Sequence, residues 1–180
     1  MGRNAFSDGD WVLSKLEDLG CCECFTCGDS DIDEYFREDV VEHRAELISQ
    51  TYYLYEVTQP DLILALLGFS NDTVRSKDIK GRVSTSAVKR YKSLPAVKLT
   101  RFGVSKQYQR MHIGTNALNL VKKFFTFDNR TGCRFVTVDA YNKPGIISFY
   151  KSNGFSFLTE KDLNRDNRAM YFDLLSFQAA

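Results

Sequence analysis

A loop that leads into a helix, residues 105–114, has a composition able to bind an anion through the backbone. The run AVKLTRFGV is typical of a strand ending at Val104, and GTNALNLVKKFFTF has the apolar spacing of an amphipathic helix beginning at Gly114. The first N–H groups of a helix lack helical partners and lie at its positive dipole end, so they can hold a pyrophosphate without a basic side chain. Many strand-to-helix turns contain one glycine, and the loop alone therefore leaves a cofactor site and an ordinary turn both open.

A second segment, VDAYNKPGIISFYKSNGF at residues 138–155, carries a tyrosine that could transfer a proton. Pro144 indicates the first turn of a short helix, and Tyr150 lies on that helix. A phenol with an ordinary pKa of ~10 stays protonated at neutral pH, which suits a proton donor. Tyr150 could equally pack into the core, and Asn142 could bind a ligand or form the turn between strand and helix.

The five cysteines do not have the spacing of a metal site. Four of them fall within CCECFTC, where Cys24 and Cys27 form one pair and His43 is a distant histidine. Zinc requires two such pairs or a pair with histidines, and a disulfide framework conflicts with the expected cytoplasmic setting. A redox pair would open a helix directly after a strand, whereas a turn at residues 28–30 follows here. We expect free, partly buried thiols, with Cys133 a core residue at the entrance of a strand, and no metal.

Helices and strands alternate along the chain. Strands are expected at 11–16, 51–58, 62–70, 96–104, 134–141, 154–160 and 167–175, and helices at 29–48, 114–127 and 144–153. The apolar stripe of the first helix is expected to consist of Ile32, Tyr35, Phe36, Val40, Leu47 and Ile48. Residues 71–95 have no clean period and are expected to form an irregular or partly helical excursion. This order predicts an α/β or α+β protein with a mixed sheet covered by helices on both faces.

Length and composition predict one globular domain over residues 1–180, since 180 residues with 43% hydrophobic content can fill one core and are short for two. No apolar run approaches ~18 residues, and the N-terminus lacks the order of a signal peptide, so we expect a soluble, cytoplasmic protein without a membrane segment.

Charge is unevenly distributed although the net charge is only +1. Residues 8–43 hold twelve Asp or Glu against Lys15 and Arg37, a net −10, and residues 75–101 hold nine Lys or Arg against Asp78, a net +8. The basic residues are Arg75, Lys77, Lys80, Arg82, Lys89, Arg90, Lys92, Lys98 and Arg101, with Tyr91 among them. Such a segment fits contact with an RNA backbone, and it equally fits a solvated surface.

The order of segments resembles the GNAT superfamily of acyl-CoA-dependent N-acetyltransferases over nearly the whole chain. Residues 109–114, QRMHIG, match the family motif Q/R-x-x-G-x-G/A at its first and last positions, and His112 stands where the motif has glycine. Asn142, followed by Phe149-Tyr150 and Gly154-Phe155, is similar to the family's second and more specific signature. FTCGDSDIDEYF and RAMYFDL resemble a bacterial subgroup that includes toxins acetylating aminoacyl-tRNA.

The resemblance implies a GNAT fold, with a mixed, mostly antiparallel sheet of six or seven strands splayed between the fourth and fifth. It implies acetyl transfer from acetyl-CoA to a primary amine by direct attack, with Tyr150 as general acid. Residues 102–104 would pair with the pantetheine, the N–H of Val104 would also stabilise the oxyanion, and residues 110–115 would hold the pyrophosphate. The implied cofactor-binding residues are Phe102, Gly103, Val104, Gln109, Arg110, Met111, His112, Ile113, Gly114, Thr115, Asn142 and Phe149. If so, the N–H of His112 faces the pyrophosphate and its imidazole points away or along the phosphate rim.

The acceptor stays open between a small-molecule or protein amine and the amino group of an aminoacyl-tRNA bound by residues 75–101. No residue stands out as general base among Asp139, Glu56 and His112. A toxin would imply an antitoxin partner, and a homodimer is a further expectation. The other class of function is a non-catalytic acyl-CoA-binding regulatory module.

Overall fold

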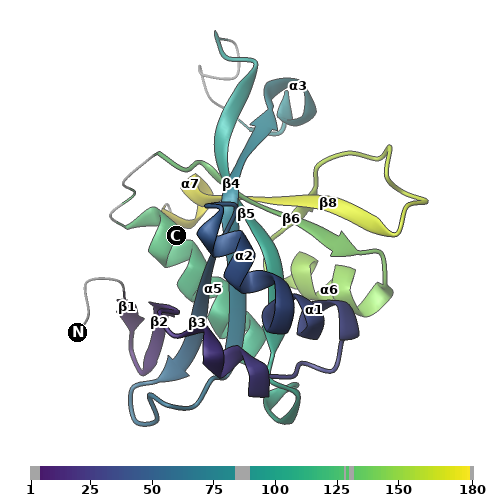
Figure 1. Ribbon diagram of the computed structural model, residues 1–180. Helices are drawn as coiled ribbons and strands as arrows, with labels where there is room; N and C mark the ends of the chain where they lie inside the picture. The colour runs from purple at the N-terminus through teal and green to yellow at the C-terminus, as the bar shows by residue number, and fades with distance from the viewer. Residues whose placement is uncertain (1–4, 84–89, 128, 130–131, 179–180) are drawn as a thin grey trace. The chain divides into compact units, whose positions relative to one another are not determined.

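The computed structural model describes residues 5–83, 90–127, 129 and 132–178 (Figure 1). The chain divides into two compact units, residues 1–70 with 100–124 and residues 71–99 with 125–180. Two long strands, β4 (Ala65–Arg75) and β5 (Ser93–Val104), contribute to both units. The strands are hydrogen-bonded in the order β1-β2-β3-β4-β5-β6-β8-β7. The expectation of a single domain stays a prediction, and each unit is described by itself.

The first unit contains an antiparallel meander of β1 (Ala5–Asp8), β2 (Trp11–Lys15), β3 (Gln50–Glu56) and the first half of β4. Strand β1 was not expected from the sequence. It forms because Gly9, at φ +60°, allows a tight turn that pairs β1 with β2. The sheet therefore has eight strands, where six or seven were expected.

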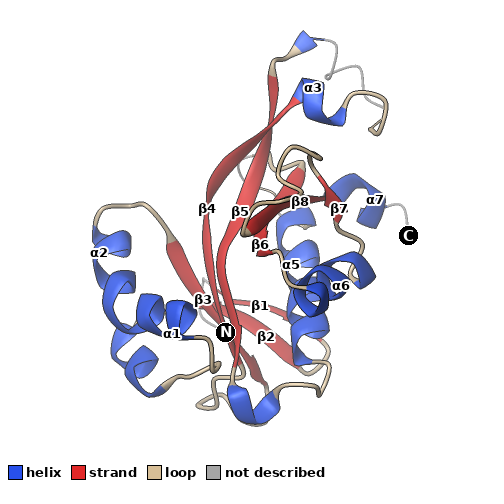
Figure 2. Cartoon of the chain, turned by 90° about the vertical axis from the view of Figure 1, so that its right-hand side faces the viewer, coloured by secondary structure: helices blue, strands red, loops and turns tan. Residues whose placement is uncertain are grey.

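Helical segments cover both faces of the meander in this unit, as Figure 2 shows. On one side lie η1 (Leu19–Cys24), α1 (Ser30–Glu34), the π-helical turn η2 (Tyr35–Asp39) and α2 (Val40–Ala45). On the other side lies α5 (Ile113–Thr126), where Phe124 packs against Phe6 and Tyr52 at 5.9 and 5.5 Å between ring centroids. Neighbouring residues of β3 point to opposite faces, so Tyr52 meets α5 while Tyr53 packs against the core under α1 and η2.

The first helical region begins as expected, because the Asp29 side chain accepts a hydrogen bond from Ile32 N as an N-cap. Its predicted apolar stripe is correct at Tyr35, Phe36 and Val40, which are buried, and at Ile32, which packs against them. The stripe is wrong at its end, where Leu47 is 84% exposed and Ile48 is 49% exposed. The helix ends at Ala45 and Leu47 adopts φ +60°, so the periodicity no longer governs which face these side chains take.

The second unit is built around β6 (Phe135–Tyr141) and β8 (Asn167–Asp173), paired antiparallel, with the short β7 (Ser156–Phe157) beside β8. Its helices are α3 (Ser76–Ile79), α6 (Pro144–Ser152) and α7 (Leu174–Gln178). The parallel pairing of β5 with β6 spans only Ala96–Lys98 opposite residues 135–137, although both strands continue. Pairing over only three residues of each strand is what is expected when two parallel strands splay apart. Among the helices described here, none combines the length and apolar character needed to cross a membrane.

Residues 71–95 were expected to form an irregular or partly helical excursion; α3 (Ser76–Ile79) is helical as expected, whereas both ends of the segment belong to strands. Strand β4 continues to Arg75, and β5 begins at Ser93. Their apolar side chains join a core that includes Val74, Ile79, Leu94, Ala96 and Phe135. Pairing and burial thus decide the structure of a segment whose own sequence pattern is obscured by its many Lys and Arg side chains.

Candidate functional site

The end of β5 approaches another part of the first unit closely. A Cβ added to Gly103 would lie 3.1 Å from Cys27 Cβ, 3.2 Å from Cys27 Sγ and 3.2 Å from Ile32 Cγ2. A larger residue at position 103 would crowd the loop at Cys27, whereas glycine allows the close approach. Phe102, Gly103 and Val104, expected to contact pantetheine, therefore lie at a strand end whose position is closely defined by its neighbours.

The next segment, residues 109–115, is called here the phosphate loop, and its backbone is unusual. Arg110 has φ +65° and His112 has φ +61°, both in the left-handed region. Residues that alternate between left-handed and other conformations turn successive N–H groups toward one point, which forms an anion-binding concavity. A glycine at position 112 would adopt this φ without strain, and histidine is among the side chains that tolerate it better than most.

The residues of the phosphate loop differ in burial. Arg110, Met111 and His112 are exposed, whereas Ile113 is 6% exposed and anchors the helix start. His112 also accepts the first hydrogen bond of α5 at its carbonyl oxygen, from Asn116 N at 3.0 Å.

Three N–H groups at the start of α5 have no hydrogen-bond partner among the residues that the structure describes. They belong to Ile113, Gly114 and Thr115, and they precede the first bonded amide of the helix. Together with the left-handed loop before it, this 14-residue helix presents a cluster of donors at its positive end. The local chemistry is that of a site for a phosphate or pyrophosphate.

Gln109 is an exposed residue whose side chain is hydrogen-bonded to two backbone carbonyl groups of the protein. Its Nε2 donates to Cys27 O at 2.6 Å and to Val104 O at 3.1 Å. The sequence motif marked this residue as cofactor-binding but could not indicate these partners, one of which is 82 positions away.

In the second unit, Tyr150 lies in an aromatic cluster on α6. The residue is 6% exposed, and its ring makes edge contacts with Phe149 and Phe155 at 5.2 and 5.3 Å between centroids. Burial raises the pKa of Tyr150 above its ordinary value, because the charged phenolate would be poorly solvated. No described residue supplies a hydrogen bond to its hydroxyl. The phenol is therefore protonated at neutral pH.

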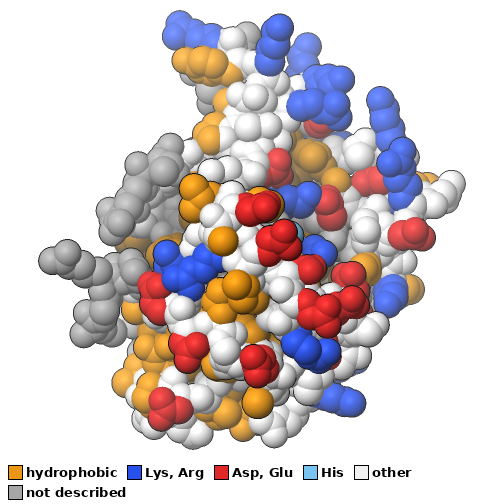
Figure 3. All heavy atoms as spheres, viewed as in Figure 1, with side chains coloured by type: hydrophobic (Ala, Val, Ile, Leu, Met, Phe, Trp, Pro, Cys, Tyr) orange, Lys and Arg blue, Asp and Glu red, His pale blue; other side chains and the backbone are white. Residues whose placement is uncertain are grey.

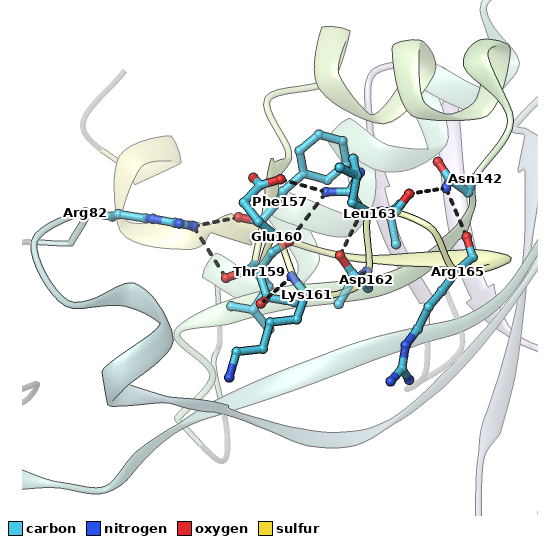
Figure 4. A network of polar contacts seen from close by, with 12 residues as sticks. Arg82, Asn142, Phe157, Thr159, Glu160, Lys161, Asp162, Leu163 and Arg165 are labelled. Carbon is cyan, nitrogen blue, oxygen red and sulfur yellow. Dashed lines mark hydrogen bonds and ion pairs between the residues drawn. The ribbon is translucent and has the colours of Figure 1, made fainter.

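Asn142 follows β6 and fastens a loop of the same unit (Figure 4). Its Nδ2 donates to Leu163 O and Arg165 O, both at 2.9 Å, and its backbone N–H donates to Asp166 O at 2.7 Å. Both amide hydrogens are used in this way, so only the carbonyl oxygen of the side chain is left to meet a ligand.

A buried ion pair that the sequence did not predict supports this loop. Arg168 is 2% exposed and donates to Asp162 at 2.8 Å, while its guanidinium lies 3.8 Å from the centre of the Phe157 ring. Asp162 also accepts from the backbone N–H of Ala169 at 2.7 Å. Figure 4 labels Phe157 and Asp162 of this network together with Asn142.

One group of basic residues of the second unit lies together around α3. We call residues 75–82 and 90–92 the basic arm, and Figure 3 shows Lys and Arg side chains grouped over α3 and the adjoining strand ends. The arm is closed by Ser76, whose N–H donates to Lys92 O at 2.9 Å. Arg75 is paired with Asp78 at 2.7 Å and Arg82 donates to Phe157 O at 2.7 Å.

The other described charges of the arm are exposed, and no described acidic group pairs with them. They are Lys77, Lys80, Arg90 and Lys92, with Tyr91 61% exposed beside them. Lys89 lies outside the described residues. Lys98, from the same basic segment, is paired with Asp139 at 2.5 Å, so that carboxylate is already engaged as an acceptor.

The cysteines are free thiols, as expected. Burial raises the pKa of Cys22 and of Cys27 to about 12, so neither is a thiolate at neutral pH. Cys133 is half-buried, and its Sγ donates to Phe135 O at 3.2 Å. Within the described part of the chain no group of three or more His, Cys, Asp or Glu is arranged to hold a metal ion.

No protein-family model matches the chain, and no curated protein matches it either. Solved structures do match. A bacterial toxin has a TM-score of 0.78 and 17% identity, covering 94% of this chain and 93% of its own. AtaT complexed with acetyl-methionyl-tRNAfMet has a TM-score of 0.69 and 22% identity over 94% and 98% of the two chains. AtaTR bound with AcCoA has a TM-score of 0.66 and 21% identity over 96% and 98%.

These similarities cover nearly the whole chain at low identity, so they establish the arrangement of the backbone. The mixed, mostly antiparallel sheet and the helices on its faces agree with them. The chain shares its fold with this bacterial toxin and with AtaT.

Proposed function

We propose that the protein is an N-acetyltransferase that uses acetyl-CoA as co-substrate. The observation that carries this proposal is the phosphate loop, in which two left-handed residues and three unpartnered N–H groups form a site for a pyrophosphate. The AtaTR structure with AcCoA supports the identity of that ligand. His112 fits the proposal, because its imidazole is exposed and its backbone has the conformation of the motif glycine.

In the proposed reaction, the lone pair of a neutral amine forms the new C–N bond with the thioester carbonyl carbon. The C–S bond breaks, the Tyr150 hydroxyl supplies a proton to the sulfur, and the phenolate takes a proton back from solvent. The surplus proton of the amine leaves to solvent. An α-amine with a pKa near ~8 is sufficiently neutral for this without a dedicated base.

Calorimetric titration with acetyl-CoA tests the proposal. We expect saturable binding and transfer of the acetyl group to an amine in a product assay. The Tyr171→Phe variant is a suitable control for Tyr150→Phe, since Tyr171 is a tyrosine of the same unit and is also 6% exposed. No binding at millimolar acetyl-CoA would rule out the enzyme, and binding without transfer to any acceptor would favour the regulatory module.

We propose the amino group of an aminoacyl-tRNA as the acceptor. The specific observation is the basic arm, with four exposed cations and an exposed Tyr91 able to contact phosphates and a base or sugar. The AtaT structure with acetyl-methionyl-tRNAfMet supports this choice. A toxin role in the cytoplasm, with an antitoxin partner, belongs to the same proposal. A small-molecule or protein amine is the competing acceptor.

Charge reversal in the basic arm separates these acceptors. Lys80→Glu should weaken binding of charged tRNA and lower the slope of log affinity against log salt by about one. Lys161→Glu, an exposed lysine of the same unit outside the arm, is the matched control. Equal tRNA affinity in both variants, or efficient acetylation of polyamines or peptides with none of charged tRNA, would eliminate the RNA acceptor.

A further inference from the structure

The loop at Thr26–Gly28 is organised by one carboxylate of the first unit. Asp33 accepts hydrogen bonds from Thr26 Oγ1 at 2.6 Å, from Cys27 N at 2.7 Å and from Gly28 N at 3.3 Å. Burial disfavours the ionised form, but these hydrogen bonds outweigh it, and the pKa of Asp33 lies below its ordinary value. An ionised acceptor with three donors holds the backbone of the loop in one conformation.

This loop is joined to the segment that follows β5 by two hydrogen bonds. Lys106 N donates to Thr26 O at 2.9 Å, and Gln109 Nε2 donates to Cys27 O at 2.6 Å. Gly103 makes the close approach to Cys27 described above. The buried Cys27 thus lies between the end of β5 and α1, which explains a small apolar side chain there without any thiol chemistry.

The peptide that follows Val104 is held at both of its polar atoms. Val104 O accepts from Gln109 Nε2 at 3.1 Å, and the N–H of Ser105, in the same peptide, donates to Leu64 O at 2.9 Å. Gln109 therefore binds two carbonyl oxygens with one amide group. Gln109 directly precedes Arg110, and His112 follows two residues after that. The left-handed backbone conformation of Arg110 and His112 costs free energy unless neighbouring contacts maintain it.

We propose that Asp33, the Thr26–Gly28 loop and the Gln109 side chain form a clasp that positions the end of β5 and the phosphate loop for coenzyme A. This inference rests on the proposed function for the identity of the ligand. Gln109 and Asp33 act as positioning residues, since their polar atoms are used within the protein. The clasp also connects two separate segments of the sequence. FTCGDSDIDEYF contains Asp33 and the Thr26–Gly28 loop, and QRMHIG contains Gln109.

The effect of the clasp should appear in cofactor affinity. A preformed cradle for the pyrophosphate interacts equally with the ground state and the transition state, so its loss raises KM and leaves kcat nearly unchanged. For Gln109→Ala we expect the calorimetric Kd and the KM for acetyl-CoA to rise about tenfold, with kcat within about twofold of the wild type.

Gln107→Ala is the matched control. Gln107 lies two residues earlier, is exposed, and has no hydrogen bond from its side chain to a described residue. Its replacement should leave Kd, KM and kcat unchanged. Equal affinity for acetyl-CoA in the wild type and Gln109→Ala would overturn the clasp, whereas no binding by the wild type would overturn the proposed function.

A second measurement does not require the ligand. Amide hydrogen exchange of the free protein should be about tenfold faster at Ser105 and Lys106 in Gln109→Ala, and unchanged there in Gln107→Ala. Asp33→Asn should produce the same local change, because one of its acceptor oxygens is replaced by an NH₂ group. In the double variant the increase in Kd should be smaller than the product of the two single increases. If the increase in Kd of the double variant equals the product of the two single increases, Asp33 and Gln109 act independently and do not form one clasp.

Discussion

The phosphate loop and the segment Asn142–Phe155 differ in how they present chemistry. The loop offers backbone N–H groups, and its side chains are exposed at Arg110, Met111 and His112 or used internally at Gln109. The second segment offers a side chain, the buried Tyr150 phenol, supported by packed aromatic rings. A backbone site depends on conformation and tolerates changes of residue type, as His112 illustrates. A side-chain site depends on the identity of one residue.

Tyr150→Phe should have the largest effect on activity. Removing a general acid lowers the rate by about 10²- to 10⁴-fold, and we expect kcat to fall within that range while acetyl-CoA affinity is retained. The ring contacts with Phe149 and Phe155 remain, so the melting temperature should change little. Fixed-time product assays measure kcat, and calorimetric titration measures the affinity for acetyl-CoA. A kcat within twofold of the wild type would show that the Tyr150 hydroxyl is not the general acid, so the second segment would not depend on this one side chain.

Asp162→Ala should cause the largest loss of stability. It leaves the Arg168 guanidinium, 2% exposed, without its closest carboxylate. Loss of one partner of a buried pair costs about 3–5 kcal/mol, and the remaining contact with Glu160 at 3.3 Å should keep the loss near the lower end. The loop fastened by Asn142 should loosen with it. The free energy of unfolding in urea checks this value. Glu160→Ala is the control and should lose less, because Glu160 Oε2 lies 3.3 Å from Arg168 Nη2 and the Glu160 side chain is 70% exposed.

Gly154→Ala should destabilise the second segment by about 2 kcal/mol. Gly154 has φ +84°, and an added Cβ would lie 2.9 Å from Cε2 of the buried Phe172 ring. Gly145→Ala, on α6 with nothing within 4 Å of the added atom, should be tolerated. Comparable losses for the two variants in thermal unfolding would contradict the structural account of Gly154.

His112→Gly should change acetyl-CoA affinity by no more than about threefold, because glycine adopts the left-handed conformation readily and the imidazole is exposed. His112→Val should weaken binding about tenfold, since a β-branched residue resists positive φ. Calorimetric Kd values for the two variants provide the check. A larger loss for glycine than for valine would assign a role to the imidazole in place of the backbone.

The smallest expected effect is that of alkaline pH. Burial raises the pKa of Tyr150 above 10, so the hydroxyl stays protonated throughout the range from pH 7 to 9. The rate should rise with the neutral fraction of the acceptor amine and show no decline on the basic side within this range. Fold stability linked to Tyr150 should likewise be constant below about pH 10 and decrease only above it. If the acetylation rate falls above about pH 8, the group whose deprotonation causes the fall is not Tyr150.

Local patterns predicted the elements that carry the site. The strand ending at Val104, the helix from about residue 113 and the short helix with Tyr150 are all where periodicity and Pro144 indicated. The predictions failed where pairing partners are distant. Strand β1 and the extensions of β4 and β5 form because other strands and a common core stabilise them, and their own sequences lack a clear period. The predicted strand at 154–160 is reduced to Ser156–Phe157, the two residues that pair with β8.

The sequence by itself determined which residue types were available: a helix start near Gly114, a tyrosine on a short helix, and cysteines without the spacing of a metal site. Only the tertiary structure decided what Gln109 and Asn142 bind, and that Arg168 is buried against Asp162. The physical reason is range. Periodicity and propensity act over a few residues, whereas a hydrogen bond between Gln109 and Cys27 depends on where the fold brings the two ends of an 82-residue separation.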